Sequence, residues 1–146
     1  MGMDMKPNIL FILTDDQRFD TIGALGNPRI RTPNLDRLAE TSMHFPRAAC
    51  TSPLCTPSRA SLATGKLPHN CGVVVHDATL PLDQVTYYQQ LRRAGYRVAL
   101  VGKSDLHKKE NICGRNGDTP QMYHYGFTDP LETEGKMNAA WYQVDE

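Results

Sequence analysis

Hydrophobic residues form two continuous runs that predict buried strands. Residues 8–14 (NILFILT) are almost entirely apolar, rich in β-branched side chains, and end at a pair of aspartates. A strand that is covered on both faces, as in a parallel sheet, has this pattern. Residues 96–101 form the second run and end at a Gly-Lys pair. Residues 43–49 are a weaker strand candidate.

Between these runs, apolar residues recur at helical spacing. The pattern predicts helices over 33–41, 57–64 and 83–94. Proline stands at the start of the first two, and glycine follows the last two, with a pair of arginines at the end of the third. The first is the best defined, because Thr32 offers an N-cap and Pro33 suits the first helical position. From residue 112 onward the pattern changes to Gly, Pro and aromatic loops, with a short helix expected over 137–144.

Strands that alternate with helices predict an α/β fold, with a mostly parallel or mixed sheet flanked by helices. In open α/β sheets, ligands bind beyond the carboxyl ends of the strands. Asp15 and Asp16 follow the first predicted strand, and Lys103 follows a later one. We therefore expect these residues to face the same crevice.

Composition narrows the function classes. The chain has 146 residues, of which 40% are hydrophobic and 22% charged, so a disordered polyelectrolyte and a membrane bundle are both excluded. Sixteen basic residues balance sixteen acidic ones, which excludes a polybasic nucleic-acid binder. The N-terminus lacks a signal-peptide pattern, so we expect no membrane partner and either a cytoplasmic protein or one whose signal has been removed.

Two groups of residues carry candidate chemistry. Adjacent carboxylates such as Asp15 and Asp16 suit a hard divalent cation, although a solvated turn or a helix N-cap would use the same residues. Cys55 lies at or just before a predicted helix N-terminus, where backbone N–H groups favour anions. Arg59, about one turn later, could hold the cysteine or an oxyanion. The alternative is a buried cysteine beside a structural arginine.

The segment that begins at Cys55, CTPSRASLATG, resembles the signature of type I sulfatases, the formylglycine-dependent members of the alkaline-phosphatase-like superfamily. Further segments resemble landmarks of that family in the same order: 7–17, 32–39, 65–73 and 95–103. The match covers about residues 6–107, whereas 108–146 are only weakly assigned. Four landmarks in the right order are far more specific than one short motif.

The resemblance implies a role for each matching residue. Cys55 would be oxidised by a formylglycine-generating enzyme to formylglycine (3-oxoalanine) and hydrated to a geminal diol. One hydroxyl of the diol would attack the sulfur of a sulfate ester, and the other would then allow sulfate to be expelled. Asp15, Asp16 and the modified Cys55 would ligate a divalent cation, usually Ca²⁺, with Mg²⁺ as the alternative. Arg59 would steady the diol, and Lys103 would neutralise the sulfate oxygens as a catalytic and substrate-binding residue.

The chain departs from the family pattern after the lysine. Many members continue Trp-His-Leu-Gly, but here Lys103 is followed by Ser-Asp-Leu and then His107. We expect His107 to replace the family histidine as a catalytic and substrate-binding residue; the alternative is a surface histidine beside two lysines. His69 fits the family pattern without a defined role. The remaining histidines, His76 among them, are interpreted as structural or exposed.

Family members are several times longer than this chain. We therefore expect residues 1–146 to be the N-terminal part of a sulfatase catalytic domain, inactive in isolation, with an apolar sheet edge that favours self-association. The expected substrate is a sulfate ester of a small molecule or carbohydrate. Two alternatives stay open, a phosphonate or phosphodiester hydrolase of the same superfamily and a non-catalytic chain that binds an anion.

Overall fold

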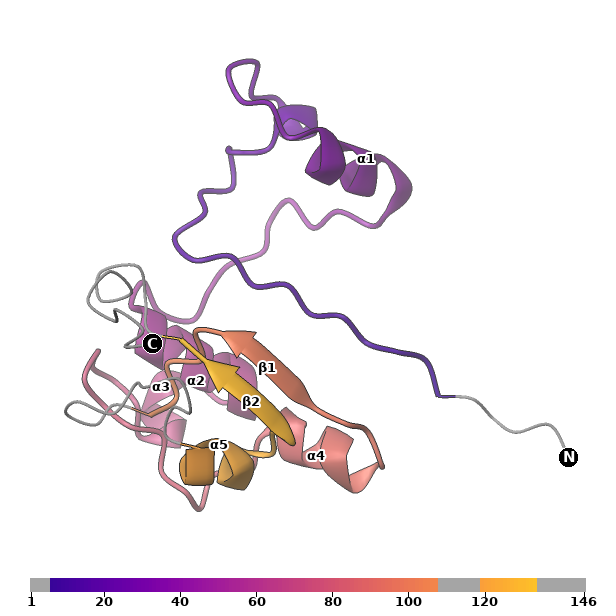
Figure 1. Ribbon diagram of the computed structural model, residues 1–146. Coiled ribbons are helices and arrows are strands. Elements are labelled where there is room, and N and C mark those ends of the chain that lie inside the picture. The colour runs from indigo at the N-terminus through magenta and orange to yellow at the C-terminus, as the bar shows by residue number, and fades with distance from the viewer. Residues whose placement is uncertain (1–5, 108–118, 134–146) are drawn as a thin grey trace, which may run out of the picture. The chain divides into compact units, whose positions relative to one another are not determined.

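The computed structural model describes residues 6–107 and 119–133 (Figure 1). The chain divides into two compact units, Met1–Ala48 and Ala49–Glu146, and each is described here by itself. No helix in the described part of the chain is both long enough and apolar enough to cross a membrane.

The smaller unit contains a 3₁₀ turn, η1 (Gly23–Leu25), and the helix α1 (Pro33–Thr41), which has the predicted bounds. A carboxylate joins the two: Oδ1 of Asp36 accepts hydrogen bonds from Thr32 Oγ1 at 2.7 Å and from the Ala24 N–H at 2.8 Å. These bonds lower the pKa of Asp36, with the bond from Ala24 as the largest cause. The turn and the helix therefore hold each other in place through side chains as well as sequence proximity.

The predicted strand over 8–14 is wrong for this chain. These residues form no strand, and Leu10 and Ile12 are 85% and 74% exposed. A strand covered on both faces needs neighbouring strands and covering helices, and within 6–107 and 119–133 no segment pairs with this one. Residues 43–49 also form no strand.

The larger unit is an α/β arrangement, which confirms the predicted fold class. Its helices are α2 (Cys55–Thr64), α3 (Pro68–Cys71), α4 (Tyr87–Arg93) and α5 (Thr119–Tyr125). The strands β1 (Ala99–Gly102) and β2 (Asp129–Glu132) are parallel and lie side by side in Figure 1. Helix α2 contacts α3 and α4, and α5 contacts α4 and β2.

Element boundaries differ from the prediction for local reasons. Helix α2 begins at Cys55, because Pro57 sits in the first turn, where its missing N–H has no intrahelical partner. Helix α4 begins only at Tyr87, because Thr86 and Gln89 form a capping box there. The sequence pattern did not predict α3, α5 or β2. The helix expected over 137–144 lies outside the described residues.

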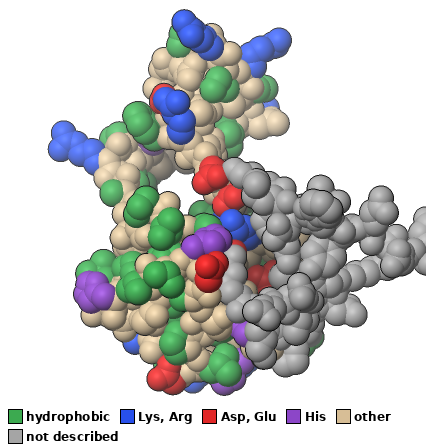
Figure 2. All heavy atoms as spheres, turned by 90° about the vertical axis from the view of Figure 1, so that its left-hand side faces the viewer, with side chains coloured by type: hydrophobic (Ala, Val, Ile, Leu, Met, Phe, Trp, Pro, Cys, Tyr) green, Lys and Arg blue, Asp and Glu red, His purple; other side chains and the backbone are tan. Residues whose placement is uncertain are grey.

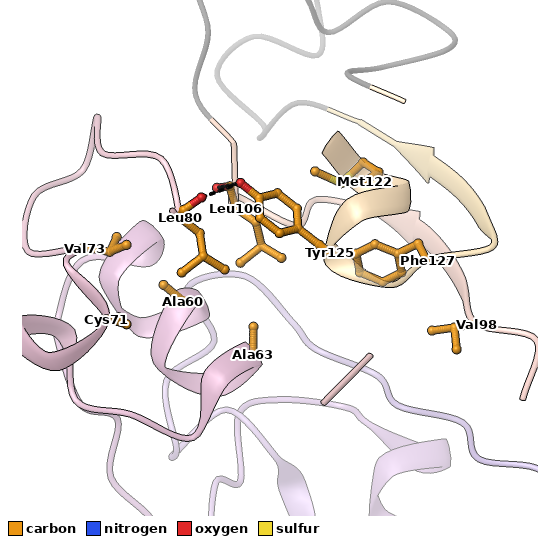
Figure 3. Close-up of a cluster of buried hydrophobic side chains, with 10 residues drawn as sticks. All are labelled: Ala60, Ala63, Cys71, Val73, Leu80, Val98, Leu106, Met122, Tyr125 and Phe127. Atoms are coloured by element: carbon orange, nitrogen blue, oxygen red, sulfur yellow. Dashed lines mark hydrogen bonds between the residues drawn. The ribbon is translucent and has the colours of Figure 1, made fainter. Parts of the chain in front are cut away.

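One hydrophobic cluster fills the larger unit (Figure 3). Its buried members are Ala60, Ala63, Cys71, Val73, Leu80, Val98, Leu106, Met122, Tyr125 and Phe127. The Tyr125 hydroxyl donates hydrogen bonds to the carbonyl oxygens of Leu80, at 2.6 Å, and Leu106, at 3.4 Å. The Leu80 N–H also donates to the Leu106 carbonyl at 2.8 Å. The loop that follows β1 is thus anchored to the core through Leu106.

Candidate active site

Cys55 is the first residue of α2, two residues before the predicted start, and Leu54 is the N-cap. The expected placement of Cys55 at the N-terminus of this helix is confirmed. The Cys55 Sγ lies 3.1 Å from Nδ1 of His76, in the segment between α3 and α4. Sequence analysis missed this contact, because the two residues are 21 positions apart and no spacing rule links them. The three cysteines in the described part of the chain, Cys50, Cys55 and Cys71, are free thiols.

Arg59 joins α2 to the loop after β1. It follows Cys55 by about one helical turn, and its Nη1 donates a hydrogen bond to the Lys103 carbonyl oxygen at 2.7 Å. Lys103 comes directly after β1 ends at Gly102. This bond joins the helix that carries Cys55 and Arg59 to the loop that carries Lys103, although Arg59 and Lys103 are 44 positions apart.

The lysine side chain is held by a carboxylate. Lys103 Nζ lies 3.3 Å from Asp105 Oδ2, and the two side chains are only 17% and 5% exposed. Asp105 has a φ of 60°, in the left-handed region that few residues other than glycine adopt. The sequence motif contains Asp105 between the lysine and the expected histidine, but nothing in the motif indicated its contact with Lys103.

Strand β2 supports the same loop. Glu132, its last residue, accepts hydrogen bonds from Ser104 through both the backbone N–H, at 3.3 Å, and the side-chain hydroxyl. Burial raises the pKa of Glu132, the bonds from Ser104 oppose this rise, and the nearby Asp105 charge adds to it. His107 is half-buried at the end of the same loop, and its catalytic role stays a prediction.

The predicted metal ligands Asp15 and Asp16 belong to the smaller unit and are exposed. Asp16 has a φ of 53°, which aspartate tolerates better than most residues. Their carboxylate oxygens are the donor type that Ca²⁺ and Mg²⁺ prefer, so the chemistry of the pair fits the expected cation. Among the described residues, no group of three or more His, Cys, Asp or Glu side chains is arranged to hold a metal ion.

The larger unit is an α/β arrangement with a cysteine at the N-terminus of α2. Arg59 of the same helix is bonded to Lys103, which directly follows the parallel strand β1. Helix N-termini and basic side chains at strand ends are features that favour anions. The family model "Sulfatase" matches residues 7–145. The chain belongs to the sulfatase family.

Individual relatives agree with this assignment. An ulvan-active sulfatase from Formosa agariphila is 38% identical over 84% of this chain and 23% of its own length. A solved structure in complex with its substrate D-glucosamine-2-N,6-O-disulfate superposes with a TM-score of 0.68 and is 36% identical, over 73% of this chain and 22% of that one. A phosphonate monoester hydrolase from Agrobacterium radiobacter superposes with a TM-score of 0.71 and 28% identity, over 93% of this chain and 28% of that one.

These matches also show how much of each relative the chain corresponds to. It spans about a quarter of the length of the curated relatives it matches, 23% and 24% for two of them. Its fold is therefore part of the alkaline-phosphatase-like sulfatase fold, represented here by helices and a small parallel sheet.

Proposed function

We propose that this protein is a sulfuric ester hydrolase that cleaves a sulfate monoester of a small molecule or carbohydrate, with Cys55 as its modified catalytic residue. Residues 1–146 form part of the catalytic domain. The observation that carries the proposal is the link between Arg59 and the Lys103 carbonyl at 2.7 Å. It joins the helix that begins with the signature cysteine to the loop that carries the sulfate-binding lysine.

The residues of the larger unit suit a sulfate group. A sulfate ester carries negative charge that shifts among its oxygens as the ester bond breaks, and fixed positive groups stabilise that charge best where water is scarce. Lys103, with 17% of its side chain exposed, supplies such a group. Arg59 supplies a second, and the N-terminus of α2 adds backbone N–H donors.

The proposed reaction needs two groups that the unmodified chain does not supply, a formylglycine and a divalent cation. Formylglycine at position 55, produced by a formylglycine-generating enzyme, would supply the nucleophilic oxygen. A bound Ca²⁺ or Mg²⁺ ion would make that oxygen more acidic and would polarise the ester. Asp15 and Asp16 would hold the cation through their carboxylate oxygens. His107, two residues after Asp105, is the candidate residue that contacts the departing alcohol and donates a hydrogen bond to it.

The test is peptide mass spectrometry across Cys55 on protein produced with and without a formylglycine-generating enzyme. We expect an aldehyde or its hydrate at Cys55 only when that enzyme is present. Cys50 is the internal control, because it is an exposed thiol five positions outside the signature and should stay unmodified. An unmodified thiol at Cys55 under both conditions would contradict the formylglycine mechanism.

A second candidate, phosphonate ester hydrolysis, is favoured by one observation, the similarity to the Agrobacterium phosphonate monoester hydrolase over 93% of this chain. The two activities are separated by kcat/KM for an aryl sulfate and for the matching aryl phosphonate monoester. We expect the sulfate to be preferred. A preference for the phosphonate would assign the protein to the second activity while leaving the role of Cys55 intact.

A further inference from the structure

We propose that Asp105 is a positioning residue that holds the ammonium group of Lys103 in the orientation that meets the sulfate oxygens. This inference rests on the proposed function, because it assigns Asp105 a role that acts through the sulfate-binding lysine. It adds a residue to the site that the family resemblance did not single out.

The ion pair is the first argument. Lys103 Nζ lies 3.3 Å from Asp105 Oδ2, and both side chains are largely buried. A lysine side chain is long and flexible, and at a partly covered site it normally extends its ammonium group into water. A short contact to a carboxylate that is only 5% exposed removes this freedom. Buried ion pairs contribute little net stability, so orientation is the better explanation for this one.

The backbone of Asp105 is the second argument. Its φ of 60° is one of two positive values among the non-glycine residues of the described chain. Glycine would adopt this conformation without strain, and asparagine as readily as aspartate. Local backbone strain therefore does not explain why a carboxylate stands here. A need for a negative charge beside Lys103 does explain why aspartate occupies this position.

The frame around the loop is the third argument. The Lys103 carbonyl accepts from Arg59, Ser104 donates to Glu132, and the Leu106 carbonyl accepts from Leu80. These bonds fix the residues on both sides of Asp105. A carboxylate on so rigid a loop can define the position of a neighbouring ammonium group, as a preorganised site requires.

The test is a double-mutant cycle on the full protein after formylglycine formation, with an aryl sulfate as substrate. Asp105→Asn keeps the size and the left-handed backbone but removes the charge. We expect it to lower kcat roughly 10- to 100-fold with a smaller change in KM. In a Lys103→Met background the same substitution should cause no further loss, because the group that Asp105 positions is gone.

Three comparisons make the test specific. Asp129→Asn is the matched control, since Asp129 also pairs with a basic residue, Arg97 at 2.5 Å, but does so on the exposed surface. It should leave kcat unchanged. Asp105→Gly removes the carboxylate without backbone strain and should reproduce the loss if the asparagine variant folds poorly. Thermal unfolding and mass spectrometry of position 55 show whether each variant is folded and modified.

Binding of inorganic sulfate, measured by calorimetry on the same proteins, supplies a readout besides turnover. Asp105→Asn removes a negative charge beside the anion site, so charge alone predicts tighter binding. Loss of lysine orientation predicts weaker binding, which is what we expect. Tighter binding with unchanged kcat would overturn the proposal, and so would equal losses in both Lys103 backgrounds. If Lys103→Met itself has no effect on hydrolysis, the proposed role of Lys103 fails instead.

Discussion

At the scale of single residues, the site depends on contacts between side chains that are far apart in the sequence. Cys55 and His76 are the clearest pair, because Sγ and Nδ1 lie 3.1 Å apart across a segment that includes α3. Sequence analysis interpreted His76 as a structural or exposed histidine. The structure confirms that His76 is exposed, and it adds a contact that the sequence did not indicate, with Nδ1 of its ring beside Sγ of Cys55, the proposed catalytic residue.

We expect His76→Ala to lower aryl sulfate hydrolysis by about 10-fold, because a hydrogen bond to the side chain at position 55 would be lost. The rate is compared at equal formylglycine content, determined by mass spectrometry. His69→Ala is the matched control, since His69 is exposed on the neighbouring helix α3 and has no contact with Cys55 among the described interactions. Equal rates for both variants would contradict a role for His76.

At the scale of secondary-structure elements, helices α4 and α5 pack together, and α5 holds the loop after β1 through the hydrogen bond from Tyr125 to the Leu106 carbonyl. Thr86, the N-cap of α4, also donates its hydroxyl to the Tyr125 carbonyl at 2.5 Å. Gly126, just after α5, has a φ of 114°, and a Cβ there would overlap the backbone of Tyr88 and Gln89. The contact between the two helices therefore requires both a left-handed backbone and the absence of a side chain.

This packing predicts that Gly126→Ala lowers the free energy of unfolding by roughly 2–4 kcal/mol, from steric overlap and an unfavourable φ together. Gly102→Ala is the matched control, because its φ of 111° is similar but a Cβ there would meet nothing within 4 Å. It should lose only the backbone part, about 1–2 kcal/mol. Chemical denaturation of the two variants measures the difference, and equal losses would show that the helix contact does not require glycine.

At the scale of the whole molecule, the chain exposes much apolar surface. Figure 2 shows hydrophobic side chains on the surface of both units. Within residues 6–107 and 119–133, the run over 8–14 is the longest continuous stretch of exposed apolar residues, with large side chains exposed from Ile9 to Leu13. Soluble monomers rarely expose large contiguous apolar patches, which instead mark surfaces that pack against something else.

The chain on its own should therefore self-associate as its concentration rises. Leu10→Lys, at a side chain that is 85% exposed, should shift it toward the monomer, because a charge in this run opposes burial. Sedimentation velocity over a range of concentrations measures the shift. Tyr123→Lys, on the exposed face of α5, is the control and should leave association unchanged. A monomer at all concentrations would contradict the expectation.

The sequence by itself determined the features that depend on neighbouring residues. Helix α1 has its predicted bounds, and Pro33 takes the first helical position as expected. Thr32 is the N-cap residue, but its side chain makes no capping hydrogen bond. The placement of Cys55 at a helix N-terminus was also predicted from nearby residues. The α/β class was predicted from the alternation of strand and helix patterns. The sulfatase family was predicted from motifs that occur in the family's order.

Only the tertiary structure decided which distant groups meet. The contact of Cys55 with His76, the bond from Arg59 to the Lys103 carbonyl and the ion pair of Lys103 with Asp105 all depend on how loops pack on the core. The run over 8–14 also shows that burial depends on distant partners. Its composition predicts a buried strand, but whether its side chains are covered depends on segments elsewhere, and here they are exposed. Local propensity acts over a few residues, whereas burial and pairing are properties of surfaces that the whole fold assembles.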